Sequence, residues 1–423
     1  MPADELVMFL HTDLSSISRG RAVPNIELGQ RLAAGVGWVP ANAALTPFGP
    51  VADPNPWGSV GDVRLLPDPE TEVRVAGLPG VPPLHFYQCD VVNLDGSGWP
   101  ACPRVFLKQV LKEFAEETGL QVVAAFEHEF YLRSAGSPAP VGAPFSQAAF
   151  REAGWFGPRL VGSLTEAGLA PETFLPEYGP GQFEVTCRPA PALQAADGAV
   201  AVREVVREVA RSAGWRATFS PVVDPALPAS GVHVHISLRD RAGRPVAHDA
   251  TGSQGLSIVA ARFASGVLEH LPAVCALTAP SLISYLRLTP HNWSSSLTCV
   301  ANDREAAIRL PGIRLGPGCP EPGEQFNLEF RFPDAAACPH LALAILVRAG
   351  LQGIQDAGAP APGGPGLPDS LVAAMAALEA DPTARSWLPA ELLETYRAVK
   401  SAEIVHLSDR TAVESCEEYL NIY

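Results

Sequence analysis

The feature that most constrains this chain is an apolar run that leads directly into two acidic residues. Residues 120–132 read LQVVAAFEHEFYL, and their β-branched and aromatic content predicts a β-strand. Side chains alternate between the faces of a strand, so Glu127 and Glu129 share one face, while His128 projects from the other and is not expected to bind a ligand. A buried carboxylate is stable only if it is paired or holds a metal. These two acids therefore require a cation.

The same spacing of polar residues recurs in three further predicted strands. The segments are GPGQFEV, GVHVHISL and NLEFRF, and each places polar side chains two residues apart on one face. These side chains are Gln182 and Glu184, preceded by Glu177; His233, His235 and Ser237; and Glu329 and Arg331. One such pair is typical of an ordinary strand with a solvated face. Four strands of this kind predict a single polar cavity in a sheet.

The residue types in this cavity indicate what would occupy it. Five carboxylates would repel one another if they were ionised with no cation between them. Oxygen ligands suit hard divalent ions, so we expect two or more Mg²⁺ or Mn²⁺ ions. Arginines nearby supply donors for carboxylate and phosphate oxygens: Arg287, Arg304, Arg309 and Arg331. This combination favours phosphoryl transfer from a nucleotide such as ATP. The sequence has no Gly-Lys pair and no G-x-G-x-x-G, which excludes the usual P-loop and Rossmann fingerprints.

Composition narrows the class of protein further. With 423 residues, 47% of them hydrophobic, the chain is long enough for two domains. Its net charge of −15 argues against nucleic acid or an anionic membrane as a main partner. The eight cysteines form no C-x-x-C pair and are expected to be reduced core residues. Neither a signal peptide nor a membrane span is recognisable, so a cytoplasmic location is expected.

The distribution of secondary-structure signals predicts an α+β organisation. Residues 1–100 are rich in Pro, Gly and short β-like runs and are expected to form a small β-rich domain. Residues 101–423 alternate helices and strands, as a mixed domain requires. We expect helices over 104–119, 197–214, 254–271, 340–358, 370–380 and 392–407. Gly119 is placed as the C-cap of the first helix and Asp369 as the N-cap of the fifth, while the Pro/Gly segment 358–368 is expected to be a loop.

The order of the motifs resembles that of the glutamine synthetase family. The chain contains E-x-E-F, E-x-G-P-G-Q-x-E, G-x-H-V-H-x-S-L, R-L-x-P, N-x-R-x-A-x-x-R and E-F-R-F-P-D, at 127–130, 177–184, 231–238, 287–290, 302–309 and 329–334. One of these motifs alone would be weak. Six in the right order identify the chain as a member of the family, from about residue 60 to the C-terminus.

The resemblance implies a role for each residue that matches a family position. Glu129, Glu177 and Glu184 would hold one metal, and Glu127, His233 and Glu329 the second. His235, Ser237 and Arg309 match positions that contact ATP. Arg304 matches the arginine that steadies the phosphoryl group during transfer, and Arg287 and Arg331 match those that bind the carboxylates of the acid substrate.

The resemblance also implies a fold, a reaction and an assembly. The family has a small N-terminal β-grasp domain and a catalytic domain whose curved antiparallel sheet forms a funnel with flanking helices. ATP phosphorylates the side-chain carboxylate of glutamate, and an amine then displaces phosphate to form an amide. Subunits form rings, commonly two stacked, in which a neighbour's N-terminal domain completes each site.

Departures from the family pattern cluster where ammonia and the acid would bind. Trp293 stands where a glutamate of the ammonium flap is expected, and it could line a pocket for an apolar or aromatic amine. The family's D-G-S-S-type loop is not legible, and Asp53 is the nearest candidate for its aspartate. Pro228-Ala229 replaces the Asn-Gly pair that takes part in recognising glutamate. The loop that is nucleotidylated in some members is replaced by GAPAPGGPGLP, so this regulation is expected to be absent.

Together these features predict an ATP-dependent ligase that joins the γ-carboxylate of glutamate to an organic amine, with Trp293 and Asp53 in the amine pocket. A monoamine is favoured, because few acids are available to bind a polycation. Two alternatives stay open: a glutamine synthetase that uses ammonia through an altered flap, and a non-catalytic member that binds ATP and metal in a regulatory role.

Overall fold

Two β-sheets organise the chain in the computed structural model, which describes residues 5–134, 142–289, 296–356 and 366–423. The first sheet has the order β2-β1-β6-β4-β3, with β5 also paired to β6. Its pairs are antiparallel except for β1 with β6. The strands are β1 (Leu6–Thr12), β2 (Ser18–Pro24), β3 (Val36–Trp38), β4 (Val63–Pro67), β5 (Val73–Val75) and β6 (Leu84–Val92).

The second sheet carries the predicted site. Its strand order is β13-β14-β15-β12-β7-β9-β8, and β10 and β11 also pair with β7. All pairs are antiparallel except β13 with β14. The strands are β7 (Leu120–Ser134), β8 (Pro171–Pro176), β9 (Gln182–Cys187), β10 (Ala190–Pro191), β11 (Trp215–Thr218), β12 (Val232–Asp240), β13 (Ser296–Ala301), β14 (Ala306–Leu310) and β15 (Leu328–Phe330).

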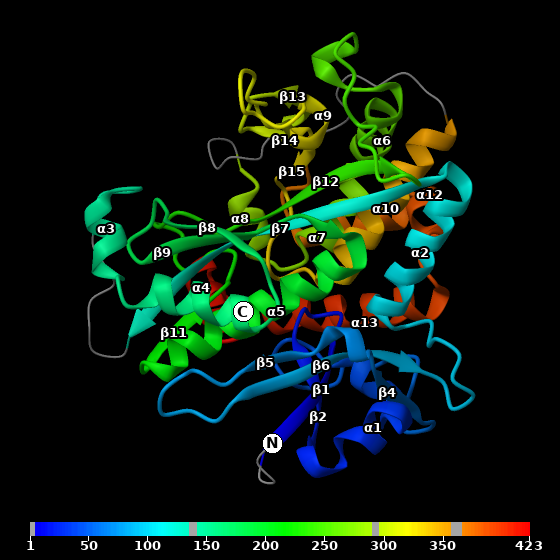
Figure 1. Ribbon diagram of the computed structural model, residues 1–423. Helices are drawn as coiled ribbons and strands as arrows, with labels where there is room; N and C mark the ends of the chain where they lie inside the picture. The colour runs from blue at the N-terminus through cyan, green and yellow to red at the C-terminus, as the bar shows by residue number, and fades with distance from the viewer. Residues whose placement is uncertain (1–4, 135–141, 290–295, 357–365) are drawn as a thin grey trace.

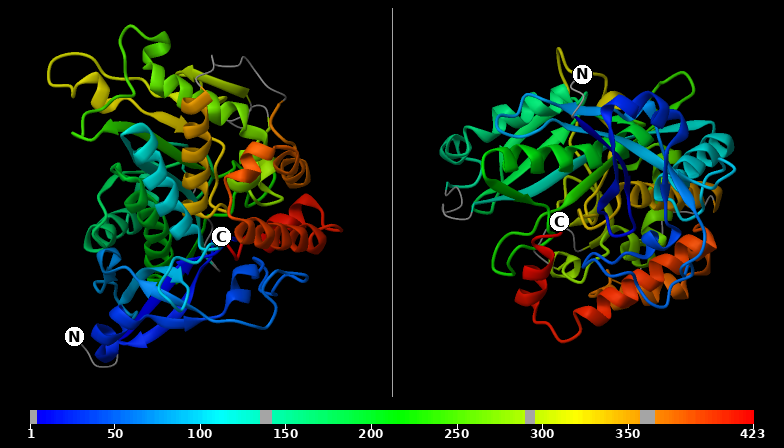
Figure 2. Two further views of the ribbon diagram at one scale, coloured as in Figure 1. Left: turned by 90° about the vertical axis from the view of Figure 1, so that its right-hand side faces the viewer. Right: turned by 90° about the horizontal axis from the view of Figure 1, so that it is seen from below.

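Helices cover one side of the second sheet and separate it from the first. The two sheets lie one above the other in Figure 1, with α2 (Pro103–Thr118) and α5 (Ala192–Ser212) packing against both β6 and β7. Near the sheets lie α1 (Leu28–Ala34), α3 (Gln147–Glu152), α4 (Phe156–Glu166), α6 (Ile258–Glu269), α7 (Leu271–Thr278), α8 (Ser284–Arg287), α9 (Pro322–Gln325) and α10 (Pro339–Asp356). The C-terminal helices, at the red end of the chain in Figure 2, are α11 (Leu371–Ala380), α12 (Pro382–Ser386), α13 (Ala390–His406) and α14 (Ala412–Tyr419).

The main hydrophobic core is continuous across the two sheets. It includes Leu10 and Phe86 of the first sheet together with Phe114 of α2 and Phe130 of β7. A second cluster lies on the other face of the first sheet, around Phe9 and Trp38. Because one core joins the two sheets, a division into domains at residue 100 stays a prediction.

Most predicted elements are present, and the differences have local causes. Gly119 caps α2 in the left-handed conformation, with φ of 72°, as expected. The helix expected from 197 begins at Ala192, directly after Pro191, and Asp197 lies within it and binds Arg104 and His340. The helix expected over 254–271 begins only at Ile258, because Ser257 is its N-cap and accepts the N–H of Ala260, and it ends at Glu269.

Two other boundary predictions were wrong. Ser370, not Asp369, is the N-cap of α11, and its hydroxyl accepts the N–H of Ala373. The strand expected over 326–332 pairs only at Leu328–Phe330. The loop predicted at 358–368 falls largely outside the described residues. All eight cysteines are free thiols, and five of them are buried.

Within the described residues, no single helix is long and apolar enough to cross a membrane. The bent pair α6 and α7, which meet at 78°, passes that test of length and composition together.

Candidate active site

The strand register places the predicted polar residues next to one another. His233 on β12 is directly opposite Glu127 on β7, and Glu129 is opposite Glu184 on β9. His235 and Arg309 both pair with Glu329, from the two strands that flank β15. Cross-strand partners share a face of the sheet, so side chains that are distant in the sequence meet on one surface.

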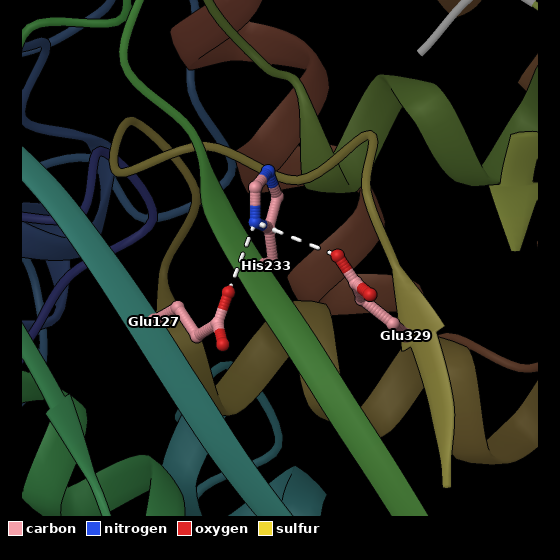
Figure 3. Close-up of side chains that lie close together, drawn as sticks. All are labelled: Glu127, His233 and Glu329. Atoms are coloured by element: carbon pink, nitrogen blue, oxygen red, sulfur yellow. Dashed lines mark hydrogen bonds and ion pairs between the residues drawn. The ribbon is translucent and has the colours of Figure 1, made fainter. Parts of the chain in front are cut away.

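Three of these residues form a compact group with the geometry of a metal site. Figure 3 shows Glu127, His233 and Glu329 pointing toward one another from β7, β12 and β15. The Nδ1 atom of His233 lies 3.2 Å from an oxygen of Glu127 and 3.8 Å from an oxygen of Glu329. One ligand atom from each residue falls within 4.8 Å of the others. This is the set that the resemblance assigns to the second metal.

Two of the carboxylates assigned to the first metal, Glu177 and Glu184, are poorly compensated by the protein alone. Burial, together with the charge of Glu129, raises the pKa of Glu177 to about 7. Burial and the neighbouring Glu127 and Glu129 also raise the pKa of Glu184 well above its usual range. Crowded acids of this kind fit a divalent cation, which would hold them ionised.

Neighbouring histidines and arginines favour the ionised forms of Glu127 and Glu329. Burial opposes ionisation of Glu127, but its contacts with His233 and His235 outweigh this and lower its pKa. At Glu329, burial is outweighed in the same way by His233, His235, Arg331 and Arg309, which lower the pKa. Arg309 donates to Glu329 Oε2 at 2.6 Å, and Arg331 donates to Oε1.

Backbone groups hold the arginines in place. Arg287 is buried and donates to the carbonyl oxygens of Phe332, at 2.9 Å, and Arg331. Arg331 in turn donates from Nε to the carbonyl of Arg304 at 3.0 Å. Only glycine fits at position 231, since a Cβ there would lie 2.7 Å from Arg287 Nη2. The N–H of Gly231 donates to Glu129 Oε2 at 2.9 Å, which joins the arginines to the acidic cluster.

These side chains line one cavity of about 890 Å³. Its charged members are Glu127, Glu129, Glu177, Glu184, Glu329, His233, Arg287, Arg304, Arg309 and Arg331. Its uncharged members are Phe145, Leu175, Tyr178, Gln182 and residues 225–229. The cavity therefore has the space and the charges to hold a small acid beside a phosphate group.

Two residues predicted to contact ATP lie further along β12. His235 Nδ1 lies 2.9 Å from Asn327 Oδ1, and its Nε2 lies 3.2 Å from Glu127 Oε1. The hydroxyl of Ser237 donates to the carbonyl oxygen of Phe326 at 2.9 Å. Neither residue lines the 890 Å³ cavity, so their role toward ATP stays a prediction.

The two residues assigned to the amine pocket are not brought into this cavity. Asp53 lines a separate hollow against α13, with Glu394 and Arg397. Its assignment to the amine pocket stays a prediction. Trp293 lies outside the described residues, and its role stays a prediction.

Several residues that shape the cavity were missed by the sequence analysis. Tyr131 continues the i, i+2 spacing of Glu127 and Glu129, so the sequence could have predicted that it lies on the same face of the strand. Its hydroxyl donates to the carbonyl of Pro228 at 2.7 Å. Phe145, Leu175 and Tyr178 belong to no periodic pattern, because they reach the cavity from a loop and a strand end. Only the tertiary structure identifies them.

Comparisons with known proteins place the chain in a family. The glutamine synthetase N-terminal domain matches residues 2–99, and the glutamine synthetase catalytic domain matches residues 100–419. The gamma-glutamylpolyamine synthetase GlnA3 of Streptomyces coelicolor is 33% identical, over 94% of this chain and 89% of its own length. The glutamine synthetase of Halobacterium salinarum is 32% identical, over 85% and 83%.

Solved structures show the same similarity. A crystal structure of a novel glutamine synthase homolog is 45% identical and superposes with a TM-score of 0.95, covering 100% of this chain and 99% of that one. GmaS in complex with ADP is 28% identical with a TM-score of 0.82, covering 97% and 95%. The chain belongs to the glutamine synthetase family. Within it, the chain is an ATP-dependent ligase that forms carbon–nitrogen bonds.

Proposed function

We propose that this protein joins the γ-carboxylate of glutamate to an organic amine through a γ-glutamyl phosphate. The observation that carries the proposal is the mixed lining of the 890 Å³ cavity, which includes the uncharged residues 225–229, Leu175, Tyr178 and Phe145 as well as carboxylates and arginines. Ammonia has no apolar group that could pack against these residues, whereas burial of an apolar amine substituent there would strengthen binding. Similarity to a gamma-glutamylpolyamine synthetase over 94% of the chain supports the same class of reaction.

The first step activates the acid. An oxygen of the glutamate γ-carboxylate attacks the γ-phosphorus of ATP, the bond from phosphorus to the β,γ-bridging oxygen breaks, and ADP leaves. Arg304 and Arg309 line the cavity and would neutralise charge on the phosphoryl oxygens during transfer. Divalent ions, Mg²⁺ or Mn²⁺, held by Glu129, Glu177 and Glu184 and by Glu127, His233 and Glu329, would supply Lewis-acid stabilisation of the same charge.

Arg287 and Arg331 would orient the acid substrate. Both are 4% exposed, and their backbone contacts set the direction of each guanidinium. A guanidinium fork suits the carboxylate of an amino acid. Pro228-Ala229 leaves this site without the amide side chain of the family's Asn-Gly pair.

The second step forms the amide. The neutral amine attacks the acyl carbon, the carbon–oxygen bond to the phosphate breaks, and the nitrogen loses one proton to the departing phosphate. The products are a γ-glutamyl amide, ADP and inorganic phosphate.

Phosphate release by the purified protein with ATP, Mg²⁺ and glutamate tests this proposal. Ammonium is compared with a panel of amines, and the product mass is checked. We expect at least one alkyl or aryl amine to exceed ammonium in kcat/KM by tenfold or more. A preference for ammonium would identify a glutamine synthetase. ATP and metal binding with no turnover of any amine would identify a regulatory member.

We propose that the active assembly is a ring of subunits. Its molar mass can be measured by light scattering. In this ring Asp53 of one subunit reaches the cavity of the next, so mixing inactive Asp53→Ala subunits with inactive Arg304→Ala subunits should restore part of the activity. A monomer with full activity would contradict the ring.

A further inference from the structure

The uncharged end of the catalytic cavity, which is held by hydrogen bonds, suggests the chemical class of the amine. It consists of Phe145, Leu175, Tyr178, Gln182 and residues 225–229. The inference rests on the proposed function, because it concerns the second substrate of the same reaction.

Hydrogen bonds hold one wall of this end in a fixed position. Tyr131 Oη donates to the carbonyl of Pro228 at 2.7 Å, and Gln182 Nε2 donates to the carbonyl of Ala229 at 3.0 Å. Gln182 Oε1 accepts the N–H of Gly179 at 2.9 Å. A Cβ at Gly179 would lie 2.0 Å from Tyr131 Oη, so this close approach needs glycine. A wall that is fixed before binding loses little entropy when it contacts a ligand.

An exposed aromatic pair forms the other part of this end. The rings of Phe145 and Tyr178 meet edge to face, with centroids 4.9 Å apart and planes at 88°. Each residue is 50% exposed. Phe145 has φ of 56°, a left-handed conformation that is unfavourable for a bulky residue and often marks a functional position.

The aromatic pair is adjacent to the acids. Tyr178 follows Glu177, and its N–H donates to Glu177 Oε2 at 3.3 Å. An amine whose nitrogen lies near the carboxylates can therefore place its substituent against Tyr178 and Phe145. Aromatic faces bind apolar and aromatic groups well.

Within one subunit, the same end offers no partner for a second positive charge, and the neighbour's Asp53 is proposed to face the reacting nitrogen. Apart from the acids, His233 and arginines already described, the described residues that line the cavity are uncharged. Asp224 is next to this wall in sequence, but it does not line the cavity, and its Oδ1 accepts the N–H of Ala226 at 2.8 Å. Burying an unpaired ammonium group is costly, so a diamine or polyamine would bind poorly.

We infer that the amine is a monoamine with a branched or aromatic apolar substituent, and that Phe145, Tyr178 and Leu227 determine this specificity. The substituent packs between the aromatic pair and the wall at Leu227 and Pro228. Its amino nitrogen faces the carboxylates and the acyl phosphate.

Steady-state kinetics with saturating ATP, Mg²⁺ and glutamate test the inference. Ammonium is compared with methylamine, isopentylamine, 2-phenylethylamine and 1,4-diaminobutane. We expect kcat/KM to rise about threefold to fivefold for each methylene group added up to isopentylamine. We expect 2-phenylethylamine to exceed 1,4-diaminobutane by at least a hundredfold.

Variants separate specificity from structure. Tyr178→Ala and Phe145→Ala should lower kcat/KM for 2-phenylethylamine tenfold or more, and change that for methylamine less than threefold. Tyr178→Phe should retain the preference, since the ring is kept. Val372→Ala is a matched control, because Val372 is 57% exposed on α11 and is not among the cavity residues.

Each outcome decides a different point. If 1,4-diaminobutane is the better substrate of the wild type, the monoamine inference is wrong, while the proposed ligase function stands. If Tyr178→Ala and Phe145→Ala lose activity equally with all amines, the two residues are structural and the specificity assignment fails. If only ammonium reacts, the proposed function itself fails.

Discussion

The two faces of β7 differ in what they contribute to the protein. On one face, Phe126, His128 and Phe130 are at most 6% exposed and pack into the main core or against it. On the other face, Glu127 and Glu129 line the cavity, beside Glu184, whose pKa is raised by burial and by neighbouring carboxylates. One face of β7 therefore contributes mainly to stability and the other to function. Substitutions on the first face should lower the free energy of unfolding, and those on the second should lower activity.

The largest effect is expected from Phe130→Ala. Phe130 is fully buried, and its ring lies 5.4–6.3 Å from the rings of Phe156, Phe183 and Phe219. Removing it should lower the free energy of unfolding by about 3–5 kcal/mol, measured by denaturant unfolding. Phe145→Ala, at an exposed phenylalanine, should cost far less. If both substitutions lowered the free energy of unfolding equally, the core would not depend on the Phe130 face of β7.

Arg304→Ala should affect catalysis with little change in stability. Arg304 lines the cavity, where its guanidinium would neutralise the phosphoryl group in the transition state. We expect kcat to fall roughly 10²–10³-fold, equivalent to about 2.7–4 kcal/mol. The melting temperature should stay within a few degrees. Arg304→Lys should recover part of the rate, and full activity of Arg304→Ala would remove this residue from the mechanism.

Glu184→Gln should stabilise the metal-free protein while it lowers activity. The pKa of Glu184 is raised by burial and by Glu127 and Glu129, so the ionised carboxylate is unfavourable in the folded state at neutral pH. A neutral amide removes that repulsion, and we expect the melting temperature without metal to rise at pH 8. With excess Mg²⁺ the order should reverse, because the variant has lost a ligand. A lower melting temperature without metal would contradict the repulsion argument.

Stabilisation by Mg²⁺ should increase with pH. The pKa of Glu177 is raised from 4.5 to about 7 by burial and by Glu129. A raised folded-state pKa favours folding below the unfolded value, and this contribution is lost as pH rises through about 7. Mg²⁺ binds the ionised carboxylate, so the Mg²⁺-induced shift in melting temperature should be larger at pH 8 than at pH 6. In Glu177→Gln this pH dependence should be weaker.

His128→Phe should have the smallest effect. Burial, with nearby Arg203, lowers the pKa of His128 to about 3, so the ring is neutral, and it packs against Phe126 and Phe219. We expect kcat/KM to change less than about twofold and the free energy of unfolding by less than about 1.5 kcal/mol. A loss of metal affinity would show that the two faces are coupled.

The predictable part of the site came from residues that lie on strands. Glu127, Glu129, His233 and Glu329 could be assigned to one polar surface because a strand alternates its side chains with a period of two. The same rule placed His128 on the opposite face. Helix boundaries were less predictable: Asp369 has the chemistry of an N-cap, but Ser370 caps α11, because geometry decides which residue caps a helix.

The sequence by itself predicted which acids and arginines would line the charged part of the cavity, because residue type and local strand periodicity place them on one face. The order of its motifs indicated the family of the chain. The tertiary structure alone decided that the acids pair across strands in the observed register, that Asp53 lies away from the cavity of its own chain, and that Phe145, Tyr178 and residues 225–229 form an apolar wall. Loops carry no periodic signal, so what they contact is set by the packing of the elements that they connect.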